Sequence, residues 1–329
     1  MNRGWTYTDR IGTTGETVLG YYMQRYRHST EAEWRSRILQ GLILLEGKPV
    51  GAQQVLSAGE TLTYRRLPWQ EPTVPLNFEV LYEDADLWAI AKPAGLPVLP
   101  GGKFLENTLL WVMRSHYPNE QPTPVHRLGR GTSGVMLVAK SQQAKSHLSE
   151  QFRARTLSST KLSSTELPST EPSSTKLPST KRSSTSPMKK VYRALIGPTN
   201  SANLAEYFYC NYAIGKIPYP QLGYVYGHKA DGLAAHSRGQ VLARKTDSTL
   251  VEVTISTGRP HQIRIHLAAA GYPLIGDPLY GVGGLPKTGG RAIPSDCGYH
   301  LHAHRLQFVH PKTGETQSVT AALPESLAC

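Results

Sequence analysis

The sequence has few cysteines and no long hydrophobic run. Only Cys210, Cys297 and Cys329 occur among 329 residues, and an odd number of widely separated cysteines excludes a disulfide framework. No apolar stretch approaches the roughly 20 residues that cross a bilayer. The first nine residues are polar and lack the hydrophobic region of a signal peptide. We therefore expect a protein of the reducing cytoplasm with no membrane partner.

Acidic residues are also scarce relative to basic ones. The chain has 24 Asp and Glu against 36 Lys and Arg, which gives a formal net charge of +12. A basic surface attracts polyanions, chiefly through phosphate contacts and the release of counterions. Charge alone leaves two interpretations open, a nucleic-acid partner or a surface that is basic only for solubility.

Residues 1–72 predict a small N-terminal module. A helix is expected over 31–40 with Arg35 and Arg37 on it, followed by a short apolar strand at 42–45. The basic helix is suited to lie along a phosphate backbone. The alternative is a capping subdomain with a solvated basic face.

Residues 73–329 predict an α+β domain. Apolar strands alternate with helix-like stretches, and two short strands flank an acidic turn near its start. The expected strands lie within 78–91 and at 135–138, 191–196 and 249–255, and the expected helices at 141–155 and 261–270. This mixture favours a domain built on a central sheet.

A repeat interrupts this domain. Between 156 and 185 the chain consists of pentads that end in Ser-Ser-Thr or Pro-Ser-Thr. Such a composition has almost nothing to bury, so it cannot offset the entropy lost on ordering. We predict a disordered insertion over 156–187, with a phosphorylatable regulatory loop as the alternative.

The turn at 124–134 is the first segment that carries chemistry. His126, Arg127 and Arg130 stand among Gly, Thr and Ser residues directly before an apolar strand. Glycines let a ligand approach the backbone closely, and arginines there are suited to bind phosphate bidentately. The alternative is a basic turn packed by its own glycines.

The second segment, 257–267, predicts a helix that begins near Arg259 or Pro260, because proline suits the first helical turn. Its spacing directs Arg264 toward an acidic partner while Ile263 and Leu267 pack inward. A core histidine or a surface arginine is the alternative for any single residue of this segment.

Two later clusters are assigned simpler roles. Asp277, which precedes a proline between glycines, is interpreted as a structural turn residue. His300, His302 and His304 share one face if they lie on a strand, a pattern that zinc uses. The sequence offers no second ligand cluster with familiar spacing, so we expect no metal.

Together these segments resemble the RluA family of RNA pseudouridine synthases over almost the whole chain. The matching motifs occur in the family's order. They are the acidic turn at 80–87, Lys92-Pro-Ala-Gly95, His126-Arg-Leu with Thr132-Ser-Gly134, Lys190-Val-Tyr192-Arg-Ala194, Gly258-Arg-Pro-His-Gln-Ile-Arg264 and Gly276-Asp-Pro-Leu-Tyr-Gly281.

This resemblance implies a fold and an activity. The expected fold is a mixed, mainly antiparallel central sheet with flanking helices over 73–329, preceded by a module over 1–72 that is similar to the alpha-L RNA-binding motif. The expected activity is isomerisation of uridine to pseudouridine in structured rRNA or tRNA, with the target base flipped out of its stack. It implies no cofactor, and nothing in the sequence demands more than a monomer.

The resemblance also assigns site residues. Tyr192 packs against the target base and is placed to help in proton transfer. Arg264 pairs with the family's nucleophilic aspartate, and Arg127 holds the flipped nucleotide. Further RNA contacts are expected from the residues around these motifs. These are His126, Arg130, Thr132, Ser133, Arg259, His261 and Gln262, together with Arg35 and Arg37 of the N-terminal module.

At the position of that aspartate this chain has Gly129. Nucleophilic or general-base catalysis needs a positioned side chain, and between 121 and 151 the only carboxylate is Glu150. Two hypotheses follow, an active synthase that uses another carboxylate, or an RNA-binding protein or chaperone that kept the fold and lost the chemistry. A carboxylate oxygen within about 4 Å of Arg264 favours the first, because opposite charges couple strongly over that range.

Overall fold

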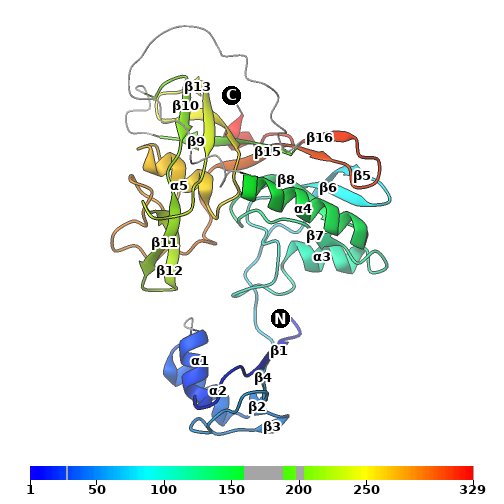
Figure 1. The fold of residues 1–329 in the computed structure, drawn as a ribbon, viewed down its shortest axis with the longest axis vertical. Coiled ribbons are helices and arrows are strands. Elements are labelled where there is room, and N and C mark those ends of the chain that lie inside the picture. Colours follow the sequence, from blue (N-terminus) through cyan, green and yellow to red (C-terminus); the bar gives the residue numbers. More distant parts are fainter. Residues whose placement is uncertain (27–28, 159–187, 198–203, 329) are drawn as a thin grey trace. The chain divides into compact units, whose positions relative to one another are not determined.

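A computed structural model describes residues 1–26, 29–158, 188–197 and 204–328 (Figure 1). The chain packs into two compact units, which are described separately. The first comprises residues 1–73, 101–106 and 218–224, and the second comprises the rest. Within the described residues, no helix is long and apolar enough to cross a membrane. The pentad repeat lies outside them except for its first three residues, which end helix α4.

The first unit holds a four-stranded antiparallel sheet and two helices. Its elements are β1 (Trp5–Arg10), α1 (Val18–Arg25), α2 (Glu31–Leu39), β2 (Ile43–Leu45), β3 (Lys48–Pro49) and β4 (Thr61–Arg66), with sheet order β1-β4-β2-β3. Helix α2 begins at the predicted residue because Thr30 and Glu33 form a capping box. Its residues Trp34 and Ile38 are buried in the core of this unit.

The second unit contains a ten-stranded sheet whose main path runs β10-β13-β14-β9-β15-β8-β6-β5. Its strands are β5 (Glu79–Glu83), β6 (Leu87–Lys92), β7 (Thr123–Pro124), β8 (Ser133–Ala139), β9 (Lys189–Ile196), β10 (Tyr207–Cys210), β13 (Ser237–Arg244), β14 (Thr249–Ile255), β15 (Leu301–Val309) and β16 (Thr316–Thr320). Strand β7 pairs with β8, and β16 with β15. The pairing of β8 with β15 is parallel and the other pairings are antiparallel, which confirms the predicted mixed, mainly antiparallel fold.

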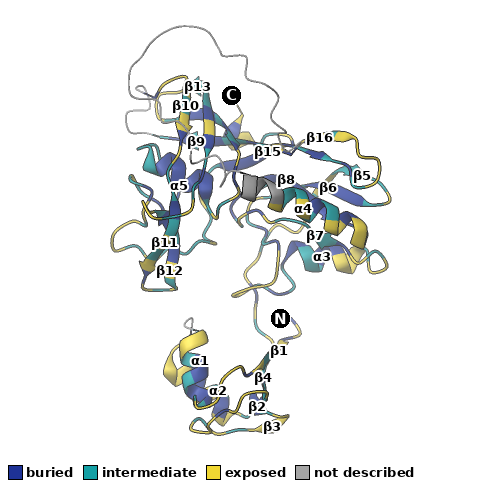
Figure 2. Cartoon of the chain, in the orientation of Figure 1, coloured by how far each residue is buried: buried dark blue, intermediate teal, exposed yellow. Residues whose placement is uncertain are grey.

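Helices cover both faces of this sheet. Alternate residues of β6 point to opposite sides, as the two-residue period of a strand requires. Leu87 and Ala89 pack in one cluster with α4 (Gln142–Ser158), whereas Trp88 and Ile90 pack in another with α3 (Leu109–His116). Strands β6, β8 and β14 are largely buried, whereas most of the loop between β15 and β16 is exposed (Figure 2).

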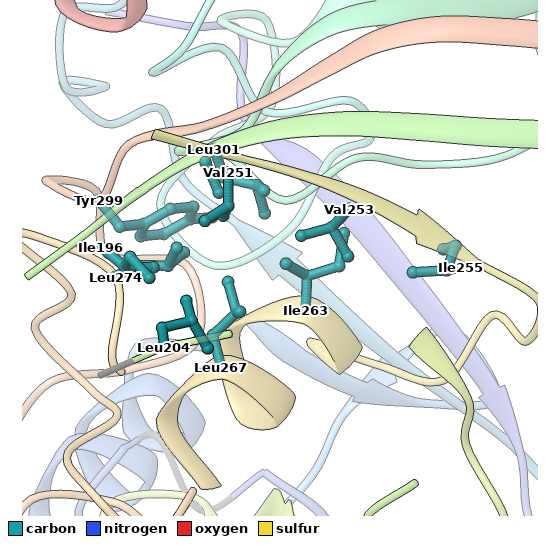
Figure 3. Packing of buried hydrophobic residues seen from close by; sticks show 11 residues of the cluster. Ile196, Leu204, Val251, Val253, Ile255, Ile263, Leu267, Leu274, Tyr299 and Leu301 are labelled. Carbon is teal, nitrogen blue, oxygen red and sulfur yellow. The ribbon is translucent and has the colours of Figure 1, made fainter. Parts of the chain in front are cut away.

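The face that carries α5 (Gln262–Ala269) positions the site. Val251 and Val253 of β14 pack against Ile263 and Leu267 of this helix, and Tyr299 borders the same cluster (Figure 3). The described residues also form a hairpin of β11 (Ile214–Tyr219) and β12 (Gly223–His228) and a 3-10 helix, Glu325–Leu327.

Candidate active site

The glycine-rich turn between β7 and β8 is held at its base by a buried lysine. Lys92 Nζ donates to the backbone carbonyls of Pro93 at 2.7 Å, Leu96 at 2.9 Å and Arg130 at 3.3 Å. The amide of Gly95 donates to the same Arg130 carbonyl at 2.8 Å. Burial lowers the pKa of Lys92 to about 7. The motif at 92–95 therefore fixes the backbone of the turn.

Helix α5 presents Arg264 to Asp277. Arg264 Nε donates to Asp277 Oδ2 at 2.7 Å and Nη2 donates to Oδ1 at 2.8 Å, with both side chains almost fully buried. Arg264 Nη1 donates to the Pro294 carbonyl at 3.1 Å. Burial disfavours the charged guanidinium, but the bonds and charge of Asp277 outweigh it and raise the pKa of Arg264. The expected acidic partner of Arg264 is present in this bidentate pair.

Asp277 is also the turn residue that the sequence predicts. Its Oδ1 accepts the backbone amides of Leu279 at 2.9 Å and Tyr280 at 3.0 Å besides Arg264. A carboxylate that accepts this many hydrogen bonds is held in one orientation. Asp277 is thus suited to orient Arg264, and its oxygens are already engaged.

Two tyrosine rings enclose the Arg264 guanidinium. Its Cζ lies 4.1 Å from the ring centroid of Tyr299 and 5.0 Å from that of Tyr280, distances at which a cation is attracted to an aromatic face. The hydroxyls of Tyr299 and Thr132 lie 3.3 Å apart. Burial raises the pKa of Tyr299, although the Arg264 charge opposes the shift. Tyr299 therefore links Arg264 to the turn.

Gly129 lies beside the Tyr299 hydroxyl. A Cβ at position 129 comes to 2.9 Å from Tyr299 Oη and 3.5 Å from Thr132 Oγ1, and a Cβ at Gly131 comes to 2.9 Å from the Tyr299 ring. Real Cβ atoms essentially never show contacts this short. Both glycines lie outside the left-handed region of φ. The space that Tyr299 occupies, and not the backbone conformation, therefore requires glycine at these two positions.

Other predicted residues surround this group. His261, in a left-handed conformation with φ of 54°, immediately precedes α5, and its Nδ1 lies 2.7 Å from Tyr280 Oη. Burial lowers the pKa of His261 to about 3, with the positive charges of Arg264 and Arg127 adding to the effect. Arg127 is exposed. The segments 124–134 and 257–267 thus come together, and Arg127 faces solvent beside them.

Some predicted contact residues have structural partners. The Gln262 amide oxygen accepts Thr257 Oγ1 at 2.6 Å and the Arg259 amide at 3.1 Å, so this buried side chain shapes the entry to α5. Arg259 Nε donates to the Ala234 carbonyl at 3.0 Å. Arg130 Nε donates to the Ser295 carbonyl at 2.7 Å. The Gln262 bonds lie within one segment, whereas the Arg259 and Arg130 bonds each join two segments that are distant in the sequence.

His126 points into the fold. Its Nε2 accepts the Leu137 amide at 3.0 Å, and its ring stacks on Phe152 of α4 with centroids 4.3 Å apart. Burial lowers its pKa well below the ordinary value, so the ring is neutral and acts as an acceptor. This placement favours a structural role for His126.

The histidines near the C-terminus have separate partners. His302 Nδ1 bonds with Ser133 Oγ at 2.8 Å, and His304 Nδ1 donates to the Ala321 carbonyl at 3.0 Å. In the part of the chain that the structure describes, no group of three ligating side chains is arranged for a metal ion.

The remaining predicted residues lie elsewhere. Tyr192 of β9 is half-buried and packs against both the α5 cluster and the α3 cluster. In the first unit, Arg35 pairs with Glu31 at 2.7 Å, and Arg37 lies over the ring of Trp34 at 4.4 Å. Tyr299 is not predicted from the sequence, since no motif marks it and its contacts arise only from folding.

Comparison with known proteins decides the family. A family model described as RNA pseudouridylate synthase matches residues 86–269, and an uncharacterized RNA pseudouridine synthase of Synechocystis is 47% identical over 94% of this chain and 95% of its own length. The chain belongs to the RluA family of RNA pseudouridine synthases. RNA pseudouridine synthase 5 of Oryza sativa is 38% identical over 99% of this chain and 89% of its own length.

A more distant relative and one solved structure extend the comparison. Ribosomal large subunit pseudouridine synthase D of Neisseria meningitidis is 30% identical over 95% of this chain and 76% of its own length. The structure of human RNA pseudouridylate synthase domain containing 1 covers 79% of this chain and 89% of its own, with a TM-score of 0.53 and 21% identity. That likeness shows the pseudouridine synthase fold.

Proposed function

We propose that this pseudouridine synthase acts on ribosomal RNA. Its relatives in Neisseria meningitidis and Xanthomonas campestris are named ribosomal large subunit pseudouridine synthases and match 95% or more of this chain. An rRNA substrate agrees with the net charge of +12 and with the cytoplasmic location expected from the sequence. The relatives are named as synthases, so they lend no support to the alternative of an RNA binder without activity.

The reaction exchanges one bond of the ribose C1′ atom for another. The target uridine is flipped into the pocket, the C1′–N1 bond breaks, the uracil turns, and a C1′–C5 bond forms. The proton on C5 is lost and N1 gains one, so the reaction is redox-neutral and needs no cofactor. The protein must orient the base, stabilise charge and move protons.

The buried pair of Arg264 and Asp277 beside the turn is the observation that carries this proposal. Asp277 orients the guanidinium through two bonds of 2.7 and 2.8 Å. A preorganised positive charge stabilises the negative charge that develops on uracil as the C1′–N1 bond breaks. Arg264 therefore acts electrostatically, and Asp277 is its positioning residue.

Two side chains, Arg127 and Tyr192, are assigned to RNA binding. Arg127 binds a phosphate of the flipped nucleotide, because its side chain faces solvent beside Gly129. Tyr192 packs against the target base from the sheet, as in the family. His126 is left out of these contacts because its ring already bonds to Leu137 and stacks on Phe152.

The N-terminal module, residues 1–72, is assigned to RNA affinity, in keeping with its likeness to the alpha-L RNA-binding motif. The catalytic domain is assigned to 73–329. Arg35 is half-exposed on α2 and its ion pair with Glu31 is a solvent-facing pair that RNA phosphates can replace. One chain supplies both parts, so a monomer suffices.

The test is pseudouridine formation by the purified protein. Unmodified large-subunit rRNA and transfer RNA transcripts labelled with tritium at uridine C5 are incubated separately, and tritium release is followed. Mass spectrometry then locates the product. We expect release from rRNA at one or a few sites, and Arg264→Met is expected to lower the rate by about 10²-fold or more, since it removes the preorganised charge. Release from transfer RNA alone would reassign the substrate.

A further inference from the structure

Gly129 stands at the position of the family's nucleophilic aspartate. The side-chain atom nearest to the place where a Cβ at this position would lie is the phenol oxygen of Tyr299. We propose that Tyr299 is a catalytic residue, whose hydroxyl stands where a side chain at position 129 would extend and carries the protons of the isomerisation. This inference rests on the proposed function, and it names the group that works in place of the aspartate.

The geometry supports this assignment. The Tyr299 hydroxyl lies 2.9 Å from the position that a Cβ at residue 129 would occupy, which is shorter than real Cβ contacts. Only glycine at position 129 leaves room for this hydroxyl. Gly131 leaves room for the ring of the same tyrosine. The ring is buried at 5% exposure, whereas Gly129 is exposed. The hydroxyl therefore lies beneath an accessible glycine, where a flipped uridine can approach closely.

The surroundings of the hydroxyl suit proton transfer. Thr132 Oγ1, at 3.3 Å, fixes its direction. The Arg264 guanidinium lies 4.1 Å from the ring centroid and stabilises a phenolate electrostatically. Burial raises the pKa of Tyr299, so the phenol holds its proton at neutral pH and begins the reaction as an acid. Asp277 is engaged with Arg264 and with two backbone amides.

The Tyr299 hydroxyl alone accounts for both proton transfers of the reaction. As the C1′–N1 bond breaks, its electron pair goes to uracil, and the Tyr299 phenol gives its proton to N1. C1′ is left as an oxocarbenium ion, as in glycoside cleavage. After the uracil turns, its C5 carbon bonds to C1′, and the phenolate takes the C5 proton. Tyr299 is thus regenerated, and no covalent intermediate or co-reactant is needed.

The decisive variant is Tyr299→Phe, which removes the hydroxyl and keeps the ring. The substrate is RNA from cells in which the gene has been deleted, because it contains the natural target in unmodified form. We expect kcat for pseudouridine formation to fall by about 10²- to 10⁴-fold, the usual contribution of general acid–base catalysis. The KM for RNA should change little, since the ring remains in place.

Tyr272→Phe is the matched control. Tyr272 packs against the same hydrophobic cluster, and we expect its variant to keep kcat within about twofold of the wild type. A Tyr299→Phe protein that keeps half of the wild-type kcat overturns the proposal. A variant whose KM for RNA rises while its kcat stays at the wild-type value overturns it as well. Inactive wild-type protein on this RNA contradicts the proposed function itself, and the inference falls with it.

A double variant, Tyr299→Phe with Gly129→Asp, distinguishes a catalytic role of the Tyr299 hydroxyl from a packing role. Gly129→Asp alone should also impair turnover, because its Cβ displaces the Tyr299 hydroxyl. In the Tyr299→Phe background, Gly129→Asp restores a carboxylate without that contact, and we expect it to raise kcat at least tenfold over Tyr299→Phe alone. A merely structural role for the hydroxyl predicts no such rescue, so its absence contradicts the proposal.

Discussion

The charged side chains of Arg264 and Asp277 are buried together, and each depends on the other for its hydrogen bonds. Arg264 and Asp277 are 3% and 1% exposed, and their two bonds replace the water that each charge loses. Removing one member of a buried pair leaves an uncompensated charge, which costs more than the pair itself contributes. The pair therefore couples the position of the Arg264 guanidinium to the stability of the domain.

Asp277→Ala is expected to lower the free energy of unfolding by about 3–5 kcal/mol, because it leaves Arg264 buried without its anion. Urea denaturation followed by circular dichroism measures the change. Asp231 provides the matched control, since its pair with Lys229 is largely exposed and Asp231→Ala should shift stability by less than about 1 kcal/mol. Equal effects of the two substitutions would contradict this account of the pair.

Buried histidines make stability depend on pH. Burial lowers the pKa of His266 from 6.5 to about 4, so the unfolded chain takes up a proton before the folded one. The stabilisation is complete above pH 6.5 and is lost as pH falls toward 4, by up to about 3 kcal/mol for this residue. Urea midpoints at pH 7, 6, 5 and 4 should therefore decline, and less steeply in His266→Gln. A variant with an unchanged slope would contradict the assignment.

Sequence motifs marked Arg127 and Arg264 as candidate site residues because both lie within short, recognisable segments. They did not mark Tyr299, whose position depends on the fit of its ring against two glycines that are distant in the sequence. Asp277 was recognised as a turn residue, but its pairing with Arg264 depends on how the following loop folds back. Steric complementarity between remote segments leaves no periodic signal in one sequence.

At the scale of elements, apolar strands were predicted well. The expected strand at 249–255 coincides with β14 and that at 191–196 lies within β9, since buried strands read as continuous apolar runs. Strands β10 to β13 were missed. Strand β10 is only four residues long, and glycines or charged residues interrupt the patterns of β11, β12 and β13. The helix predicted from near Arg259 begins at Gln262, because His261 adopts a left-handed conformation.

The junction of β8 and β15 depends on one glycine. Gly134 has φ of +109°, and a Cβ there would overlap the Ala303 carbonyl, at the parallel pairing that supports the turn. We expect Gly134→Ala to destabilise the domain by at least about 2 kcal/mol more than Gly271→Ala, a control with φ of +92° and open space around it. Thermal and urea unfolding of both variants measure the difference, and similar losses would show that backbone conformation alone matters.

For the whole molecule, charge governs the encounter with RNA. The net charge of +12 predicts affinity dominated by phosphate contacts. Raising salt from 50 to 200 mM should weaken binding to rRNA fragments by about 10³-fold if six or more phosphates are contacted. Filter binding across this range gives the slope, and Arg127→Ala should reduce its magnitude by about one unit. A flat salt dependence would contradict a phosphate-dominated interface.

The most direct test of the central claim, an active synthase without the usual aspartate, is a pseudouridine map of cellular RNA with and without the gene. We predict that deletion removes pseudouridine from one or a few sites in large-subunit rRNA. The wild-type gene should restore these sites and the Arg264→Met gene should not. Identical maps with and without the gene would contradict the account.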